Sequence, residues 1–253
     1  MTQITLLSDF GLVDPFVGLM KSAVLARCPT ATLVDLTHDI EPQDVPGGAF
    51  WLERCSCWFA RGTVHLAVVD PGVGTSRPGV VLEADQQLYV GPHNGLFDRI
   101  IRRARVQRLH LIDVQALGIA RPSATFHGRD VFGPVAGLLA SGRLSAHDVG
   151  PEMEATPALG DADRSGRGAG EVVVVDRFGN LITDIECSAD PEQRPSQVRV
   201  AGLTLVLSRC YADVAPGELL ALVNSFGTIE IAVREGSAAQ KLGLGRGVPV
   251  TAK

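Results

Sequence analysis

The first 150 residues alternate between short apolar runs and longer stretches in which apolar residues recur at helical spacing. Short apolar runs predict β-strands, and the helical spacing predicts α-helices. The expected strands are Ile4–Leu7, Thr32–Leu36, Val64–Val69, Gly79–Leu82, Leu88–Val90 and Leu109–Ile112, and the expected helices are Phe16–Ala26, Gly47–Phe59 and Asp130–Leu139. This alternation predicts an α/β N-terminal domain over residues 1–150 with a mostly parallel sheet.

The pattern changes after residue 150. Residues 151–170 lack apolar periodicity and are rich in Gly, Pro, Ala and charge, which is typical of a linker. Closely spaced strand patterns follow at Glu171–Val175, Leu181–Asp184, Gln197–Val200, Leu203–Leu207, Leu219–Val223 and Ile229–Val233, with one helical pattern at Ser237–Leu242. Short strands separated by turn residues predict a smaller all-β C-terminal domain over 171–253, built as a barrel or a sandwich.

Charge and cysteine content narrow the partners and the location. The 253 residues include 23 Lys and Arg against 28 Asp and Glu, a net charge of −5, so we expect a small-molecule partner and no nucleic acid. No apolar run reaches the ~18 residues that a membrane span needs. The five cysteines are an odd number, and the start of the chain lacks a signal-peptide pattern, which predicts reduced thiols and a cytoplasmic location. Their spacing does not match a zinc site, so no metal is expected.

Polar residues follow several of the expected strands. Signatures of triphosphate-binding loops, dinucleotide-binding folds, serine hydrolases and zinc proteases are absent. Asp9 instead follows the first strand, and Asp70 follows Val64–Val69 in a Pro-Gly-Val-Gly turn that continues to Arg77. Ligands bind α/β sheets at the carboxyl ends of the strands. Asp70 therefore either faces a ligand or only caps its turn.

Three further segments combine polar groups with aromatic rings. His127 precedes an expected helix, although a lone histidine is more often structural or exposed. The turns Asp176–Asn180 and Asn224–Gly227 each place donors and acceptors beside a phenylalanine, which suits a flat heterocycle and a zwitterion. The alternative is two β-turns held by Asx-type hydrogen bonds. His65 lies inside an apolar strand, which indicates a core position.

Seven ordered segments together resemble the S-adenosylmethionine (SAM) hydroxide adenosyltransferases, the hydrolytic relatives of fluorinase and chlorinase. The segments are Ser8–Gly11, Asp35–Ile40, Val69–Gly74 with Arg77, Gly91–Leu96, Thr125–Asp130, Asp176–Asn180 and Asn224–Gly227. The resemblance runs from residue 4 to about residue 250. It implies an N-terminal α/β domain and a C-terminal β-barrel, assembled as a homotrimer with SAM bound between the N-domain of one subunit and the C-domain of its neighbour.

The implied reaction is SAM plus water giving adenosine and L-methionine, with SAM as substrate and neither a cofactor nor a metal. By the same resemblance, Asp70, Arg77 and His127 surround the attacking water, and Asp9 holds the ribose diol. The remaining matches are Phe178 and Asn180 on the purine side, Asp176 and Ser225 at the amino acid end of methionine, Phe226 where halogenases have an Arg for the methionine carboxylate, and Glu230, which fits the hydrolase pattern. Strand alternation predicts that Glu230 lies on the polar face of its strand.

Two departures from the halogenases favour hydrolysis. Halogenases carry Tyr where this chain has Asp70, and fluorinase carries a hydroxyl residue where this chain has Gly128. Two alternatives to a SAM hydrolase are a SAM-dependent halogenase and a non-catalytic protein that binds SAM or adenosine. The sequence leaves open whether Asp70 or His127 takes the water proton, because the loop geometry sets their pKa values.

Overall fold

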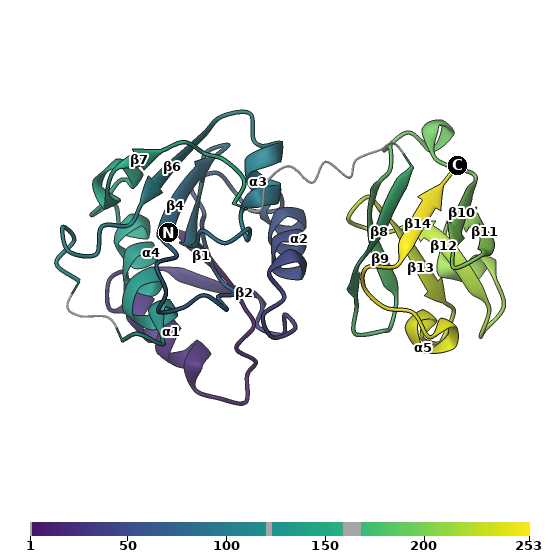
Figure 1. Cartoon of the computed structure of the whole chain (residues 1–253), viewed down its shortest axis with the longest axis horizontal. Helices are drawn as coiled ribbons and strands as arrows, with labels where there is room; N and C mark the ends of the chain where they lie inside the picture. Colours follow the sequence, from purple (N-terminus) through teal and green to yellow (C-terminus); the bar gives the residue numbers. More distant parts are fainter. Residues whose placement is uncertain (1, 120–122, 159–167) are drawn as a thin grey trace. The chain divides into compact units, whose positions relative to one another are not determined.

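The computed structural model describes residues 2–119, 123–158 and 168–253. The chain divides into two compact units, Met1–Asp161 and Ala162–Lys253, which appear in purple to teal and in green to yellow in Figure 1. Among the described residues, no helix is both long and apolar enough to cross a membrane.

The first unit is built on a seven-stranded sheet with the order β2-β1-β3-β5-β4-β6-β7. Its strands are β1 (Gln3–Ser8), β2 (Thr32–Thr37), β3 (Val64–Val68), β4 (Gly79–Ala84), β5 (Gln87–Pro92), β6 (Gln107–Leu111) and β7 (Glu152–Met153). β2, β1, β3 and β5 pair in parallel, whereas β4, β6 and β7 add antiparallel pairs. The sheet is therefore mixed, and the expectation of a mostly parallel sheet is corrected.

The antiparallel half begins at a two-residue turn. Asp85 and Gln86 connect β4 to β5, with φ of +48° and +70°. Two consecutive positive φ angles are typical of the tight type I′ hairpin turn, which returns the chain directly alongside the strand it leaves. A parallel neighbour would have needed a long crossover instead.

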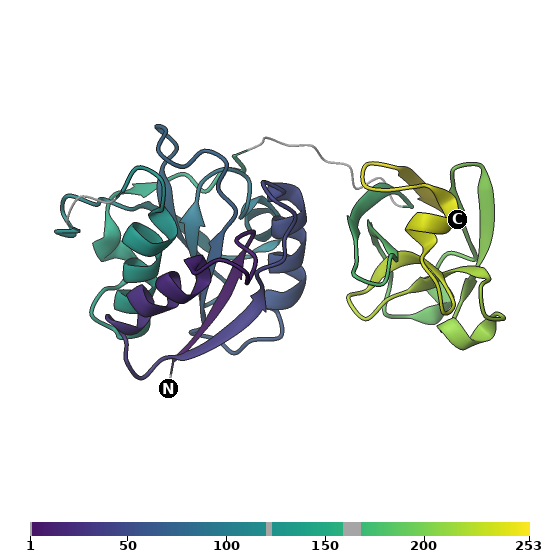
Figure 2. The ribbon, with the colours of Figure 1, turned by 90° about the horizontal axis from the view of Figure 1, so that it is seen from below.

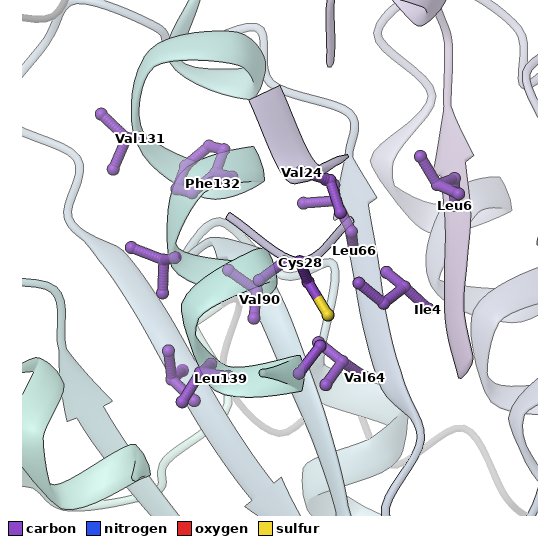
Figure 3. Close-up of a cluster of buried hydrophobic side chains, with 14 of the residues drawn as sticks. Ile4, Leu6, Val24, Cys28, Val64, Leu66, Val90, Val131, Phe132 and Leu139 are labelled. Carbon is purple, nitrogen blue, oxygen red and sulfur yellow. The ribbon is translucent and has the colours of Figure 1, made fainter. Parts of the chain in front are cut away.

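Helices cover both faces of this sheet (Figure 1). α1 (Phe16–Leu25) and α4 (Gly133–Ala140) pack on one face, and α2 (Val45–Ser56) and α3 (Asp98–Arg103) pack on the other. Successive strand residues point to opposite faces of the sheet. Leu6 packs in the core beneath α1 and α4, called the first core, and Leu7 packs in the second core, beneath α2 and α3. Figure 3 shows the first core, which includes Val24 and Leu139 from the helices and Val64 from the sheet.

One edge of the sheet collects the carboxyl ends of the four parallel strands. β1 pairs with β2 on one side and β3 on the other, so the chain order reverses at β1. In open α/β sheets such a reversal opens a crevice beyond the strand ends, where ligands bind. The segments after β1, β2, β3 and β5 contain Asp9, His38, Asp70 and Asn94.

The second unit is a closed barrel (Figure 2). Its strand order is β10-β11-β12-β13-β9-β8-β14, and pairing of β14 with β10 closes it. The elements are β8 (Ala169–Val175), β9 (Leu181–Glu186), β10 (Gln197–Val200), β11 (Leu203–Ser208), β12 (Leu219–Val223), β13 (Thr228–Val233), α5 (Ala238–Leu242) and β14 (Pro249–Ala252). Of the two architectures expected from sequence, the barrel is confirmed.

Short elements lie outside the expected ones. Within the predicted linker 151–170, Glu152–Met153 form β7 and Ala169–Gly170 begin β8, while 159–167 lie outside the described residues. α3 and β14 were also unexpected, because six- and four-residue elements carry too few apolar positions to show a period. A π-helical turn covers Gly128–Phe132, and 3-10 turns cover Ala146–Val149, Pro191–Gln193 and Tyr211–Asp213.

Candidate active site

Asp70 and Arg77 lie in the loop that follows β3. Nη2 of Arg77 donates a hydrogen bond to Oδ2 of Asp70 over 2.5 Å. Only 5% of the Asp70 side chain and 9% of the Arg77 side chain are exposed. The guanidinium carbon also lies 5.5 Å from the centre of the Phe132 ring. A carboxylate and a guanidinium are thus held as a largely desolvated pair at the edge of the sheet.

The loop that carries His127 packs against the Asp70 loop. Gly74 has a φ of +81°, and a Cβ there would lie 2.5 Å from the backbone oxygen of Ala124. Glycine therefore allows an approach that a larger residue would block. Nδ1 of His127 lies 3.3 Å from Nη2 of Arg77. The three residues that resemblance assigned to the attacking water are in direct contact through Arg77.

These contacts determine how the groups are protonated. Burial raises the pKa of Asp70, and the charge of Arg77, together with hydrogen bonds from Arg77 and the Gly72 backbone, opposes that rise. Burial and the Arg77 cation lower the pKa of His127, so the imidazole is neutral at pH 7. A guanidinium only donates, so Nδ1 of His127 accepts from Arg77 and the ring proton resides on Nε2. Oδ1 of Asp70 is buried and makes no hydrogen bond of good geometry to the described residues.

Asp9 occupies the turn that follows β1. The backbone N–H of Gln43 donates to Oδ2 of Asp9 over 2.9 Å, which orients the carboxylate. The preceding Ser8 is buried, and its hydroxyl oxygen lies 2.7 Å from Nδ1 of His38. Nε2 of His38 lies 3.3 Å from Oδ1 of Asp35. Asp35 and His38, which sequence left without a role, therefore support the turn that presents Asp9.

In the second unit, Asp176 organises the turn that follows β8. Its Oδ1 accepts hydrogen bonds from the backbone N–H groups of Phe178 at 2.9 Å and Asn180 at 2.8 Å, and its Oδ2 accepts from Nδ2 of Asn180 at 3.0 Å. Asn180 is buried, whereas 76% of Phe178 is exposed. The Asx-type turn proposed as the alternative is thus present, and it presents the Phe178 ring to solvent.

The turn after β12 is formed by the side chain of Asn224. Its Oδ1 accepts hydrogen bonds from the backbone N–H groups of Phe226 at 3.0 Å and Thr228 at 3.1 Å. Ser225 is exposed at the tip of the turn, and Phe226 is half-buried. Ser225 is therefore accessible to a ligand.

Glu230 is buried in β13, where all six residues are buried. The expectation that Glu230 lies on a polar face is corrected in this respect, because both faces of the strand are covered. Oε1 of Glu230 accepts a hydrogen bond from the hydroxyl of Tyr211 over 2.5 Å. Burial raises the pKa of Glu230, and the nearby charge of Asp176 adds to the rise. The carboxyl of Glu230 thus holds the hydroxyl of Tyr211 in position.

The described structure divides the predicted site residues between the two units. Asp70, Arg77 and His127 are in contact, and Asp9 follows the neighbouring strand. The second unit holds the remainder, namely Asp176, Phe178, Asn180, Ser225, Phe226 and Glu230. Within the described ranges, no group of three or more His, Cys, Asp or Glu side chains is arranged to hold a metal ion.

The sequence matches the SAM hydroxide adenosyltransferase N-terminal domain over residues 4–150 and the corresponding C-terminal domain over residues 170–251. The chain belongs to the SAM hydroxide adenosyltransferase family. It is similar to the (R)-S-adenosyl-L-methionine hydrolase of Thermus thermophilus, at 39% identity over 259 residues that cover 99% of each chain. It also resembles the crystal structure of a conserved Thermotoga maritima protein, with a TM-score of 0.89 at 35% identity, covering 99% of this chain and 100% of the other. Similarity to a fluorinase of Nocardia brasiliensis is lower, at 26% identity over 293 residues covering 99% of this chain and 96% of that one.

Gly128, next to His127 in the chain, is packed against two aromatic rings. A Cβ at Gly128 would lie 3.3 Å from a ring carbon of Phe10 and 3.3 Å from a ring carbon of Phe126. These two rings pack edge to face with centres 5.7 Å apart. A hydroxyl side chain at this position would need the rings to move, so aromatic carbon occupies the space beside His127.

Tyr211 contacts one of the predicted site residues, Glu230, and sequence reasoning did not single it out. Its partner Glu230 is 19 residues away, and the intervening chain includes β12. No local spacing signals such a contact. The sequence offers only an aromatic residue, Tyr211, in a polar segment that precedes a Pro-Gly pair.

Proposed function

We propose that this chain hydrolyses SAM to adenosine and L-methionine. The observation that carries the proposal is the contact of Asp70, Arg77 and His127, in which Oδ2 of Asp70 binds Arg77 and the buried Oδ1 makes no hydrogen bond of good geometry to the described residues. Membership of the SAM hydroxide adenosyltransferase family supports it, as does the similarity to a Thermus protein named as a SAM hydrolase. Asp70 favours hydrolysis over halogenation, because a carboxylate repels halide.

The enzyme must activate the nucleophile, water, because the sulfonium of SAM already provides a good leaving group. A water oxygen forms a bond to C5′ of SAM while the C5′–S bond breaks, and that bond's electron pair neutralises the sulfonium to give the thioether of methionine. The water must lose a proton in the process. We assign this proton to Oδ1 of Asp70, because Nδ1 of His127 is already an acceptor for Arg77. The Nε2–H group of His127 then orients the water oxygen.

Substrate binding follows the same proposal. Asp9 accepts hydrogen bonds from the ribose hydroxyls, and its fixed orientation supports this role. Exposed Phe178 and the buried amide of Asn180 contact the purine. Asp176, Ser225 and Phe226 surround the amino acid end of methionine. Glu230 acts through Tyr211, since its Oε1 is engaged by that hydroxyl.

The proposal also covers assembly, location and metals. We expect a cytoplasmic homotrimer in which an N-terminal domain and a neighbouring subunit's barrel contact the same SAM molecule. The division of site residues between the units supports this assembly, and five free cysteines support the location. Mixing inactive Asp70→Asn and Asn180→Ala chains would then restore part of the activity, and monomer mass in light scattering would contradict the trimer. Activity should survive EDTA, because the sulfonium needs no Lewis acid.

The deciding experiment is incubation with SAM in ¹⁸O-labelled water. The name of the Thermus relative specifies the R form, so both sulfonium epimers are supplied. Labelled oxygen in the 5′-hydroxyl of adenosine, with equimolar unlabelled methionine, is the expected result. Formation of 5′-chloro-5′-deoxyadenosine in added chloride would show a halogenase instead. SAM that binds without any product would show a non-catalytic protein.

A further inference from the structure

We propose that Asn94 is a positioning residue that fixes the Asp70 loop on the sheet. The inference rests on the proposed function, because the loop carries the assigned base. Asn94 lies in the turn between β5 and α3, and β5 runs parallel to β3 and beside it. The turn contacts the Asp70 loop near both of its ends.

At the first end, Asn94 binds the carbonyl that directly precedes Asp70. Nδ2 of Asn94 donates to the backbone oxygen of Val69 over 2.9 Å. The pairing of β3 with β1 ends at Val68 and its pairing with β5 ends at Leu66, so the ladder leaves this carbonyl without a strand partner. Val69 is fully buried, and a buried carbonyl needs a donor. The amide of Asn94 supplies it.

The amide of Asn94 is itself fixed in orientation. The backbone N–H of Leu96 donates to its Oδ1 over 3.3 Å, so the Nδ2 group must point toward Val69. Leu96 is fully buried. Gly91, just before the turn, approaches the sheet so closely that a Cβ there would lie 2.1 Å from the backbone oxygen of Ala67. Asn94 therefore lies in a closely packed part of the first unit.

At the second end, the same turn binds the carbonyl of Pro78. The backbone N–H of His93 donates to this oxygen over 3.0 Å, and Nη1 of Arg77 donates to it over 2.7 Å. Within the described residues between these ends, the backbone hydrogen bonds are local, such as Thr75 N–H to the Gly72 oxygen. Two adjacent residues of one turn thus bind the loop at the carbonyls just before Asp70 and just after Arg77.

The test compares Asn94→Ala and Asn94→Asp with the matched control His93→Ala. Asn94→Asp keeps the shape of the side chain but replaces the donor with an acceptor facing the Val69 carbonyl. His93→Ala keeps the backbone N–H that reaches Pro78. Hydrogen–deuterium exchange over residues 70–78, measured without substrate, is expected to accelerate in both Asn94 variants and to match wild type in His93→Ala.

Kinetics on SAM supply the second measurement. A small displacement of a catalytic group lowers kcat steeply, so both Asn94 variants should lose ~10- to 100-fold in kcat while KM stays within about 2-fold. Unchanged exchange, unchanged kcat in Asn94→Asp, or loss of cooperative unfolding would each overturn the inference, the last because it would show a purely structural role. If the wild-type protein does not cleave SAM but the Asn94 variants still show accelerated exchange, the proposed function is rejected. The inference that Asn94 fixes the Asp70 loop then stands.

Discussion

Replacing Asp70 with Asn separates the charge of this residue from its shape. The side chain of Asp70 is 5% exposed, and its Oδ2 lies 2.5 Å from Nη2 of Arg77. The asparagine side chain would fill the same volume. It would leave the guanidinium of Arg77, itself only 9% exposed, without a carboxylate partner.

The magnitude follows from that distance and burial. At an effective dielectric constant of about 20, two unit charges 2.5 Å apart attract by about 7 kcal/mol. Desolvation outweighs this attraction at both groups, as the raised pKa of Asp70 and the lowered pKa of Arg77 show. Breaking a buried pair on one side typically costs about 3 kcal/mol in the free energy of unfolding. Losing the base adds at least a ~100-fold fall in kcat.

The assay combines adenosine formation, SAM binding and urea denaturation. Asp70→Asn should show both losses while SAM binding stays largely intact, and the double variant Asp70→Asn/Arg77→Gln should regain part of the stability without regaining activity. Asp14→Asn, an exposed residue of the same unit, serves as the matched control. Near-wild-type turnover in Asp70→Asn would refute the assignment of Asp70 as base.

Three further predictions concern other titratable groups. If Asp70 takes the proton, His127→Asn should lower kcat by ~100-fold, and kcat of the variant should still decrease as the pH is lowered. If kcat of the variant no longer decreases at low pH, His127 is the base. Tyr211→Phe should raise KM about 5-fold with little change in kcat, because the hydroxyl held by Glu230 orients a binding surface; a fall in kcat alone would argue against that role. Burial lowers the pKa of His65 to about 4 from its ordinary 6.5. Between these pH values the unfolded chain binds a proton that the folded chain does not. The free energy of unfolding should therefore fall by about 3 kcal/mol as the pH drops through this window. Urea titrations at pH 7 and pH 4 should show this loss, and an equal loss in His65→Gln would assign it to other groups.

The strands were predictable wherever an apolar run had both faces covered. Val64–Val69 was expected from sequence and β3 covers Val64–Val68, because every residue there is buried. Pairing direction was not predictable, since it depends on the Asp85–Gln86 turn, whose residues lack the glycine that usually marks such a turn. Local pattern thus predicts that a strand exists, while its partner depends on backbone angles that the pattern does not encode.

The chemistry of the site was partly predictable. The resemblance named Asp70, Arg77 and His127, and the structure brings them into contact. The tautomer of His127 follows from a 3.3 Å distance that no spacing reveals. Tyr211 was missed for the same reason, because its partner comes from a strand distant in sequence. Residue types were therefore predictable, and the direction of each hydrogen bond was not.

The packing around Gly128 restricts the order in which substitutions can accumulate in this lineage. Any side chain at 128 meets Phe10 and Phe126 at 3.3 Å, so its effect on fitness depends on which residues already occupy positions 10 and 126. A serine at 128 requires these rings to move by a few tenths of an ångström, and a smaller residue at position 10 or 126 would reduce that movement. Substitutions at positions 10, 126 and 128 are therefore expected to be non-additive.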